Sequence, residues 1–198
     1  MPKKIASIVP FLTVLALAGC ITATGPSPAS PPSPSVSPKE SPSASPTTPA
    51  ETFTPGAPEG QCLTANLLVS VVDEGSSAGH LHSQVVFTNR GPACVLDGFP
   101  TVQVMKAGVP MGSGSEDDSS AAEAPVPLAS GGTAVAQLTS VNINSDGGPL
   151  GDSCVVDHGT GYLITPPHSY TPIPADVADL PACTNGTVWM MAGPVTAP

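Results

Sequence analysis

Basic residues are scarce in this chain. Lysine and arginine together number 5, against 15 aspartates and glutamates, and the formal net charge is −10. Nucleic-acid binding depends on a basic surface that neutralises phosphates, so the composition argues against DNA and RNA as partners. The same charge repels anionic lipid head groups and keeps a protein soluble.

Long apolar runs are also missing, except near the start of the chain. A helix that crosses a bilayer needs about 20 apolar residues, and the apolar run 5–17 is shorter than that. Lys3 and Lys4 precede this run and small residues follow it, which is the pattern of a cleaved secretory signal. The sequence therefore predicts a removable signal peptide over residues 1–19 and no second membrane span.

The signal ends in the tetrapeptide Leu17-Ala18-Gly19-Cys20. It resembles the bacterial lipobox, in which small residues before a cysteine fit a lipoprotein signal peptidase. The resemblance implies that a diacylglycerol is attached to the Cys20 thiol and that the mature chain begins there. Because two or more acyl chains anchor a protein stably, we expect a lipid-anchored protein on the extracytoplasmic face of the cell membrane.

Aromatic and branched aliphatic residues are nearly absent from residue 21 to residue 60, where proline, serine, threonine and alanine dominate. Such a segment buries too little apolar surface to offset the entropy of ordering it. Closely spaced prolines favour extended polyproline II conformations. We therefore expect residues 20–60 to be a lipidated N-terminus and a disordered tether, whose composition also suits O-glycosylation.

Cysteine usage agrees with export to an oxidising compartment. The chain has 5 cysteines, and setting aside the lipidated Cys20 leaves an even number for disulfides. Four cysteines allow three pairings, among which the sequence does not choose. We favour Cys62–Cys94 and Cys154–Cys183, each of which closes a loop of about thirty residues. A structural zinc site is the alternative, although no two cysteines form a C-x-x-C pair.

Residues 61–198 have the composition of one folded domain. Short apolar or alternating runs, separated by Gly, Pro and Asn, predict β-strands. The expected strands cover residues 67–72, 81–88, 101–105, 133–143, 162–165 and 187–191. Alternation places Val85 with Phe87, and Val102 with Val104, on shared faces. Short strands with such turns predict an all-β fold, an antiparallel β-sandwich.

Three segments carry more specific expectations. In the run 133–143 the apolar candidates are Val135, Leu138, Val141 and Ile143. Residues 175–180 predict one short helical turn. Residues 112–124, rich in glycine, serine and acids, predict a long exposed loop.

Several motifs of the domain form a recognisable set. The most specific block is Phe87-Thr88-Asn89, followed by Cys94 and Leu96-Asp97-Gly98-Phe99-Pro100. Weaker members are Cys62, residues 128–138, Cys154, Pro166-Pro167, Cys183 and Gly193-Pro194-Val195. Together they resemble the DUF4232 domain of actinobacterial exported proteins, from about residue 61 to 195. The chain departs from that pattern at Ser130-Gly131, where the family usually has a Pro-Gly turn.

The resemblance implies an immunoglobulin-like sandwich with no assigned function and no catalytic residues. Such domains commonly follow a lipobox and a Pro/Ser/Thr-rich tether. Within the main block, a bond from Cys94 to Cys62 is expected to pin the first strand to that corner. Gly98 permits a sharp bend that turns Phe99 inward.

His80 and His82 are the candidate metal ligands of the domain. Alternation places both on one face of a strand, where they suit copper or zinc. Soft sulfur ligands are also available, namely Met105, Met111, Met190 and Met191. Two histidines do not complete a site, and the sequence does not show that His158, His168 or a methionine approaches them. No cofactor is predicted, and a metal carrier stays an alternative.

Catalytic motifs are not found. The chain has no G-x-S-x-G elbow and no S-x-x-K with supporting motifs, and Asp157-His158 has no defined serine partner. The acidic segments 116–118 and 146–152 do not fit the D-x-[DN]-x-[DN]-G calcium loop, and Asn185-Gly186 predicts a hairpin turn. We expect a non-enzymatic domain that binds a cell-envelope protein or glycan. The alternatives are a metal or small-molecule carrier and a structural envelope spacer.

Overall fold

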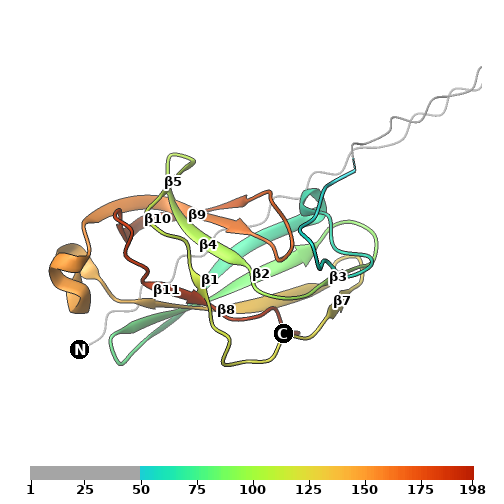
Figure 1. The fold of residues 1–198 in the computed structure, drawn as a ribbon, viewed down its shortest axis with the longest axis horizontal. Helices are drawn as coiled ribbons and strands as arrows, with labels where there is room; N and C mark the ends of the chain where they lie inside the picture. The colour runs from blue at the N-terminus through green and yellow to red at the C-terminus, as the bar shows by residue number, and fades with distance from the viewer. Residues whose placement is uncertain (1–49) are drawn as a thin grey trace, which may run out of the picture. The chain divides into compact units, whose positions relative to one another are not determined.

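The computed structural model describes residues 50–198 of the chain (Figure 1). The predicted signal peptide, Cys20 and the tether up to residue 49 lie outside these residues. Across residues 50–198, no helix has the length and apolar character needed to cross a membrane.

The described residues form β-strands joined by turns and short 3-10 helices. The strands are β1 (Leu67–Ser77), β2 (His80–Asn89), β3 (Cys94–Leu96), β4 (Thr101–Lys106), β5 (Val109–Met111), β6 (Glu116–Asp117), β7 (Val126–Leu128), β8 (Thr133–Val141), β9 (Val156–Thr165), β10 (Ile173–Cys183) and β11 (Met190–Ala192). The 3-10 helices are η1 (Thr64–Asn66), η2 (Asn144–Asp146) and η3 (Gly148–Ser153).

The strands form two main sheets that pack face to face (Figure 1). One has the order β1-β2-β8-β11-β6, the other β10-β9-β4-β5, and β3 pairs with β7 in a small ladder. All pairs are antiparallel except β11 with β6. The predicted immunoglobulin-like antiparallel β-sandwich with two disulfides is therefore confirmed.

The core lies between the two sheets and follows the predicted alternation. Val85 and Phe87 of β2 are fully buried, as are Val102 and Val104 of β4, and all four belong to one apolar cluster. Phe87 lies opposite Ala134 of β8. A large side chain therefore has a small one beside it on the same face, which helps the layer fill without strain.

The inward face of β8 differs from the prediction. Ala134 and Leu138 point into the core, whereas Val135 lies on the opposite face. Val135 is nevertheless buried, and its backbone pairs with that of Thr196 near the end of the chain. Ile143 is buried beyond the end of the strand, which stops at Val141. The sequence pattern could not show that both faces of this strand are covered.

The helical turn predicted at residues 175–180 is wrong, because this segment belongs to β10 and pairs with β9. Ladder hydrogen bonds to a neighbouring strand outweigh the weak helix propensity of two alanines. A bulge interrupts the pairing between Asp176 and Leu180.

The bounds of other elements also differ from the prediction. Strand β9 begins at Val156, β11 covers only Met190–Ala192, and the expected loop 112–124 contains the short strand β6.

The predicted bend at Gly98 is present, with φ of 95°, a backbone conformation that glycine adopts without strain. The side chains that it buries differ from the expectation. Leu96 and Pro100 are fully buried, whereas Phe99 is only half-buried. The bend therefore packs the two residues around Phe99 more deeply than Phe99 itself.

The disulfides are Cys62–Cys94 and Cys154–Cys183, the pairing that we favoured from the sequence.

Hydrogen bonds give residues 51–60, part of the expected tether, a defined path along the domain. The Glu51 carboxylate accepts from the backbone N–H of Thr64 at 2.7 Å and from the Ser169 hydroxyl at 3.2 Å. The backbone N–H of Thr54 donates to the carbonyl of His168 at 2.8 Å.

Candidate functional site

The two candidate metal ligands, His80 and His82, are two residues apart on β2, and both face away from the core. His82 Nε2 hydrogen-bonds with Ser77 Oγ at 2.8 Å, and His80 Nδ1 with the carbonyl of Ala78 at 3.2 Å. In residues 50–198, no three or more His, Cys, Asp or Glu side chains gather as a metal site. The shared face was predicted correctly, and the histidines are engaged locally.

The methionines and the other histidines are dispersed. Met105 and Met190 are buried in the core, and Met111 packs against its edge. Met191 is exposed, and together with His80 it lines an outer hollow of about 210 Å³ that also includes Glu116. His82 does not line that hollow.

Asp157 and His158 take part in surface ion pairs. Lys106 Nζ donates to both Asp157 carboxylate oxygens, at 2.8 and 2.6 Å. This hydrogen bond is the main reason that the pKa of Asp157 is lowered. His158 Nδ1 lies 2.6 Å from Asp179 Oδ1. Within the described part of the chain, neither Asp157 nor His158 bonds a serine hydroxyl, so no triad is assembled here.

A different site lies between the two sheets. It is a cavity of about 160 Å³, which we call the intersheet cavity. Its apolar lining consists of Val71, Leu81, Val177 and Leu180. Its polar lining consists of Asp73, Ser83, Ser140 and Tyr162. Strands β1, β2 and β8 contribute one wall, and β9 and β10 contribute the other.

The strand register explains why polar side chains face this interior. Val71 lies opposite Val85, and the next inward pair along β1 and β2 is Asp73 opposite Ser83. One step further along β2, Leu81 lies opposite Ser140 of β8. Because side chains alternate between the two faces of a strand, the inward face changes from apolar to polar toward this end.

Two largely buried side chains of the cavity carry hydroxyls that have no partner in residues 50–198. Tyr162 is 5% exposed and Ser140 is 6% exposed, yet neither hydroxyl has a hydrogen-bond partner among the described residues. Asp73 lies at the exposed mouth, where its Oδ1 accepts from the Gly75 backbone N–H at 2.7 Å. Neither hydroxyl oxygen is among the fully enclosed, unpaired atoms of the described residues, so both can be reached from the cavity. A cavity that keeps them unpaired is therefore suited to a hydrogen-bonding ligand.

Asp73 is the charged residue in the lining of the intersheet cavity. Burial of the phenol, and secondarily the negative charge of Asp73, raises the pKa of Tyr162 to about 12. The phenol therefore keeps its proton at neutral pH and can both donate and accept. Tyr162 and Asp73 both line the intersheet cavity, so the negative charge of Asp73 acts on the phenol.

Irregular backbone surrounds the cavity on three strands. A bulge in β1 falls between Asp73 and Gly75, and another in β10 falls between Asp176 and Leu180. Beside Tyr162, Gly161 lets β9 approach β10, since a Cβ there would lie 2.4 Å from the Ala175 carbonyl oxygen. Bulges re-aim side chains and are common beside functional sites.

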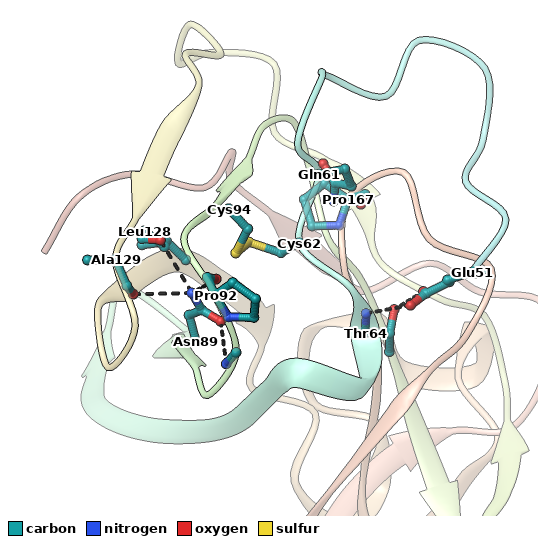
Figure 2. Close-up of a disulfide and its surroundings, with 11 residues drawn as sticks. Glu51, Gln61, Cys62, Thr64, Asn89, Pro92, Cys94, Leu128, Ala129 and Pro167 are labelled. Atoms are coloured by element: carbon teal, nitrogen blue, oxygen red, sulfur yellow. Dashed lines mark hydrogen bonds between the residues drawn. A yellow bond between two sulfur atoms is a disulfide. The ribbon is translucent and has the colours of Figure 1, made fainter. Parts of the chain in front are cut away.

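A contrasting polar cluster, which we call the Asn89 corner, surrounds the Cys62–Cys94 disulfide (Figure 2). Asn89 is fully buried, and its Nδ2 donates to the carbonyls of Pro92, Leu128 and Ala129 at 2.7, 3.3 and 3.2 Å. Its Oδ1 accepts from the Gly91 backbone N–H at 2.9 Å. Backbone groups therefore satisfy both ends of this amide.

Two other oxygens near that corner, Gln61 Oε1 and Asp97 Oδ1, lack partners among the described residues. Gln61 is held through its Nε2, which donates to the Pro167 carbonyl at 2.9 Å (Figure 2). Both oxygens are fully enclosed by protein. They therefore differ from the hydroxyls of the intersheet cavity, which a ligand in the cavity can reach.

The comparison with known families gives one match. A family model described as "Domain of unknown function (DUF4232)" matches residues 62–196. The chain belongs to the DUF4232 family. No curated protein and no solved structure matches the chain. In this DUF4232 domain, the motif block from Phe87 to Pro100 lies at the Asn89 corner, so the residues that first indicated the family are structural ones.

Sequence reasoning missed the polar lining of the intersheet cavity. Its four polar residues come from four strands, and only the fold brings them together. A signal was nevertheless present, because polar residues occupy inward positions at Val71-x-Asp73, Leu81-x-Ser83 and Leu138-x-Ser140. A break in apolar alternation near the end of a strand is thus a usable indicator of such a cavity.

Proposed function

We propose that this DUF4232 protein is a cell-envelope lipoprotein, held on the extracytoplasmic face of the membrane by lipid on Cys20. The sequence Leu17-Ala18-Gly19-Cys20 after an apolar run supports the anchor. The disulfides Cys62–Cys94 and Cys154–Cys183 support export, because such bonds persist in oxidising compartments. The proline-rich tether then holds the folded domain away from the lipid.

We further propose that the β-sandwich is a non-enzymatic binding domain. The observation that carries this proposal is the intersheet cavity, where the largely buried side chains of Tyr162 and Ser140 present hydroxyls that have no hydrogen-bond partner among the described residues. Its lining includes two serines but no histidine, so their hydroxyls have no imidazole beside them to act as a base. An apolar pocket with a few converging polar groups is the common form of a small-ligand site.

The anchor is tested by expressing the precursor in a bacterium that lipidates exported proteins. The mature protein is expected to begin at Cys20, to carry the added mass of the lipid, and to enter the detergent-rich phase on phase separation. Cys20→Ala is expected to abolish the added mass and the detergent partitioning, and Thr22→Ala, which leaves the tetrapeptide intact, is expected to retain them. A wild-type protein in the aqueous phase without added mass would contradict the proposal.

The same preparation separates the binding proposal from the carrier alternative, which draws on the outer hollow shared by His80 and Met191. Elemental analysis is expected to give no stoichiometric copper or zinc. An equimolar metal that disappears in the His80→Ala/His82→Ala variant would replace the proposal with a metal carrier.

A further inference from the structure

The intersheet cavity carries one charge that no basic side chain of residues 50–198 neutralises. Asp73 is its only charged lining residue, and no ion pair joins it to a basic side chain among the described residues. Residues 50–198 contain only Arg90 and Lys106 as Lys or Arg, and Lys106 is engaged by Asp157. A free carboxylate at the mouth of a cavity with low-dielectric walls attracts a cation and repels an anion.

The hydrogen-bonding groups narrow the kind of cation. The carboxylate of Asp73 and the hydroxyls of Tyr162, Ser83 and Ser140 can all accept hydrogen bonds. A primary ammonium group has three N–H donors and no acceptor. It can therefore satisfy Asp73 and two hydroxyls at once, whereas a quaternary ammonium has no N–H to give them.

The size and the apolar lining describe the rest of the ligand. A volume of about 160 Å³ is close to that of a protein cavity that binds benzene, about 150 Å³. The occupant therefore has on the order of six heavy atoms, as in pentylammonium or the side chain of lysine. The apolar walls, which include Val71, Val177 and Leu180, suit an unbranched hydrocarbon stem.

We propose that the intersheet cavity binds a primary alkylammonium group through Asp73 and Tyr162, with the alkyl stem between the apolar walls. The group belongs either to a free amine or to a lysine side chain of an envelope peptide. This inference rests on the proposed binding role of the sandwich and names the ligand chemistry for it.

The test is a calorimetric titration of the full mature protein, in nonionic detergent, with pentylammonium chloride. The expected result is saturable one-site binding. Pentan-1-ol and pentanoate are expected to bind at least about tenfold more weakly, since the first has one donor and the second has the wrong charge. Each titration is corrected for protein-free micelles. No saturable binding, or equal binding of pentan-1-ol, would overturn the inference.

Variants test the assigned residues. Asp73→Asn and Tyr162→Phe are each expected to weaken pentylammonium binding by about tenfold, from the loss of a hydrogen bond to a charged group. Glu74→Gln is the matched control, because Glu74 is adjacent to Asp73 but accepts from Gln137 Nε2 at 2.7 Å on the outer face. Equal effects of Asp73→Asn and Glu74→Gln would also overturn the inference. If Asp73→Asn fails to fold, the inference is decided by the binding of pentylammonium to Tyr162→Phe and by the comparison with pentan-1-ol.

Two further arms keep the outcomes separate. Nα-acetyl-lysine methylamide that binds as tightly as pentylammonium indicates a lysine side chain as the ligand. If pentylammonium binds and Nα-acetyl-lysine methylamide does not, the ligand is a free amine. The detergent-phase test of the anchor is independent, because lipidated protein without amine binding overturns only this inference, and amine binding without lipid overturns only the anchor.

Discussion

Polar side chains occur at two places inside this domain, fully hydrogen-bonded at one and left unpaired beside a cavity at the other. At the Asn89 corner, backbone carbonyls and an N–H satisfy the amide completely. At the intersheet cavity, the hydroxyls of Tyr162 and Ser140 have no partner within residues 50–198. On β1, Asp73 lies six positions after Leu67, the partner of Asn89, which is about 20 Å along the strand. Polarity at the corner thus holds the fold, while polarity at the cavity stays available.

The largest expected effect comes from the disulfide at the corner. Cys62→Ala/Cys94→Ala is expected to lower the free energy of unfolding by about 3–4 kcal/mol, because the bond spans 32 residues. Urea denaturation monitored by circular dichroism measures the change. Pentylammonium binding is expected to persist in the folded variant. Unchanged stability would show that the corner does not hold the fold.

Removing the amide at the corner is expected to cost almost as much. Asn89→Ala leaves the buried carbonyl of Leu128 and the part-buried carbonyl of Ala129 without their donor, and the expected loss of stability is about 3 kcal/mol. The same denaturation experiment measures it. Asn142→Ala is the control, since Asn142 is exposed, and its expected change is within about 0.5 kcal/mol. Equal effects of the two variants would remove the distinction between corner and surface.

At alkaline pH the cavity should affect stability through Tyr162. Its pKa is raised from 10.0 to about 12 by folding, so the folded state retains a proton that the unfolded state loses. The stabilisation is fully present below pH 10 and is lost as the pH rises through about 12, amounting to about 2–3 kcal/mol. Tyr162→Phe should remove this part of the pH dependence, measured by urea denaturation from pH 9 to pH 12.

Tyrosinate absorbance gives a direct control for this effect. The chain has 2 tyrosines, and Tyr170 is 63% exposed. The Tyr170→Phe variant should therefore show a single titration, that of Tyr162, near pH 12. A midpoint near 10 would mean that the phenol is not enclosed as described.

The smallest expected effect is the most informative contrast with Asn89. At pH 7, Tyr162→Phe removes a hydroxyl that has no partner in the described part of the chain, so the stability of the variant should stay within about 1 kcal/mol of wild type. Thermal unfolding at pH 7 measures the difference. A loss comparable to that of Asn89→Ala would show that the hydroxyl stabilises the fold rather than being held for a ligand.

Much of the fold could be predicted from local patterns. Alternation identified the buried faces of β2 and β4 through Val85, Phe87, Val102 and Val104. It failed where a distant segment pairs with a strand, as Thr196 does with the buried Val135, and where sheet pairing overrides local propensity, as at residues 175–180. Both failures depend on contacts far apart in sequence, which local periodicity does not report.

The candidate site was less predictable than the fold. His80 and His82 share a face because they are two residues apart on one strand, and the sequence showed that. Asp73 and Tyr162 belong to strands in opposite sheets, so only the packing of the sandwich brings them to one cavity. Sequence motifs indicated part of the Asn89 corner, because Asn89 and Cys94 are close together in the chain, whereas Leu128 and Ala129 reach the corner only through the fold.

The contrast between the corner and the cavity is tested most directly by NMR chemical-shift mapping of the mature protein during a pentylammonium titration. The account predicts saturable shifts at Asp73, Ser140 and Tyr162, with Asn89 and Cys94 unchanged. Shifts centred on the Asn89 corner, or the absence of saturable shifts at the cavity, would contradict it.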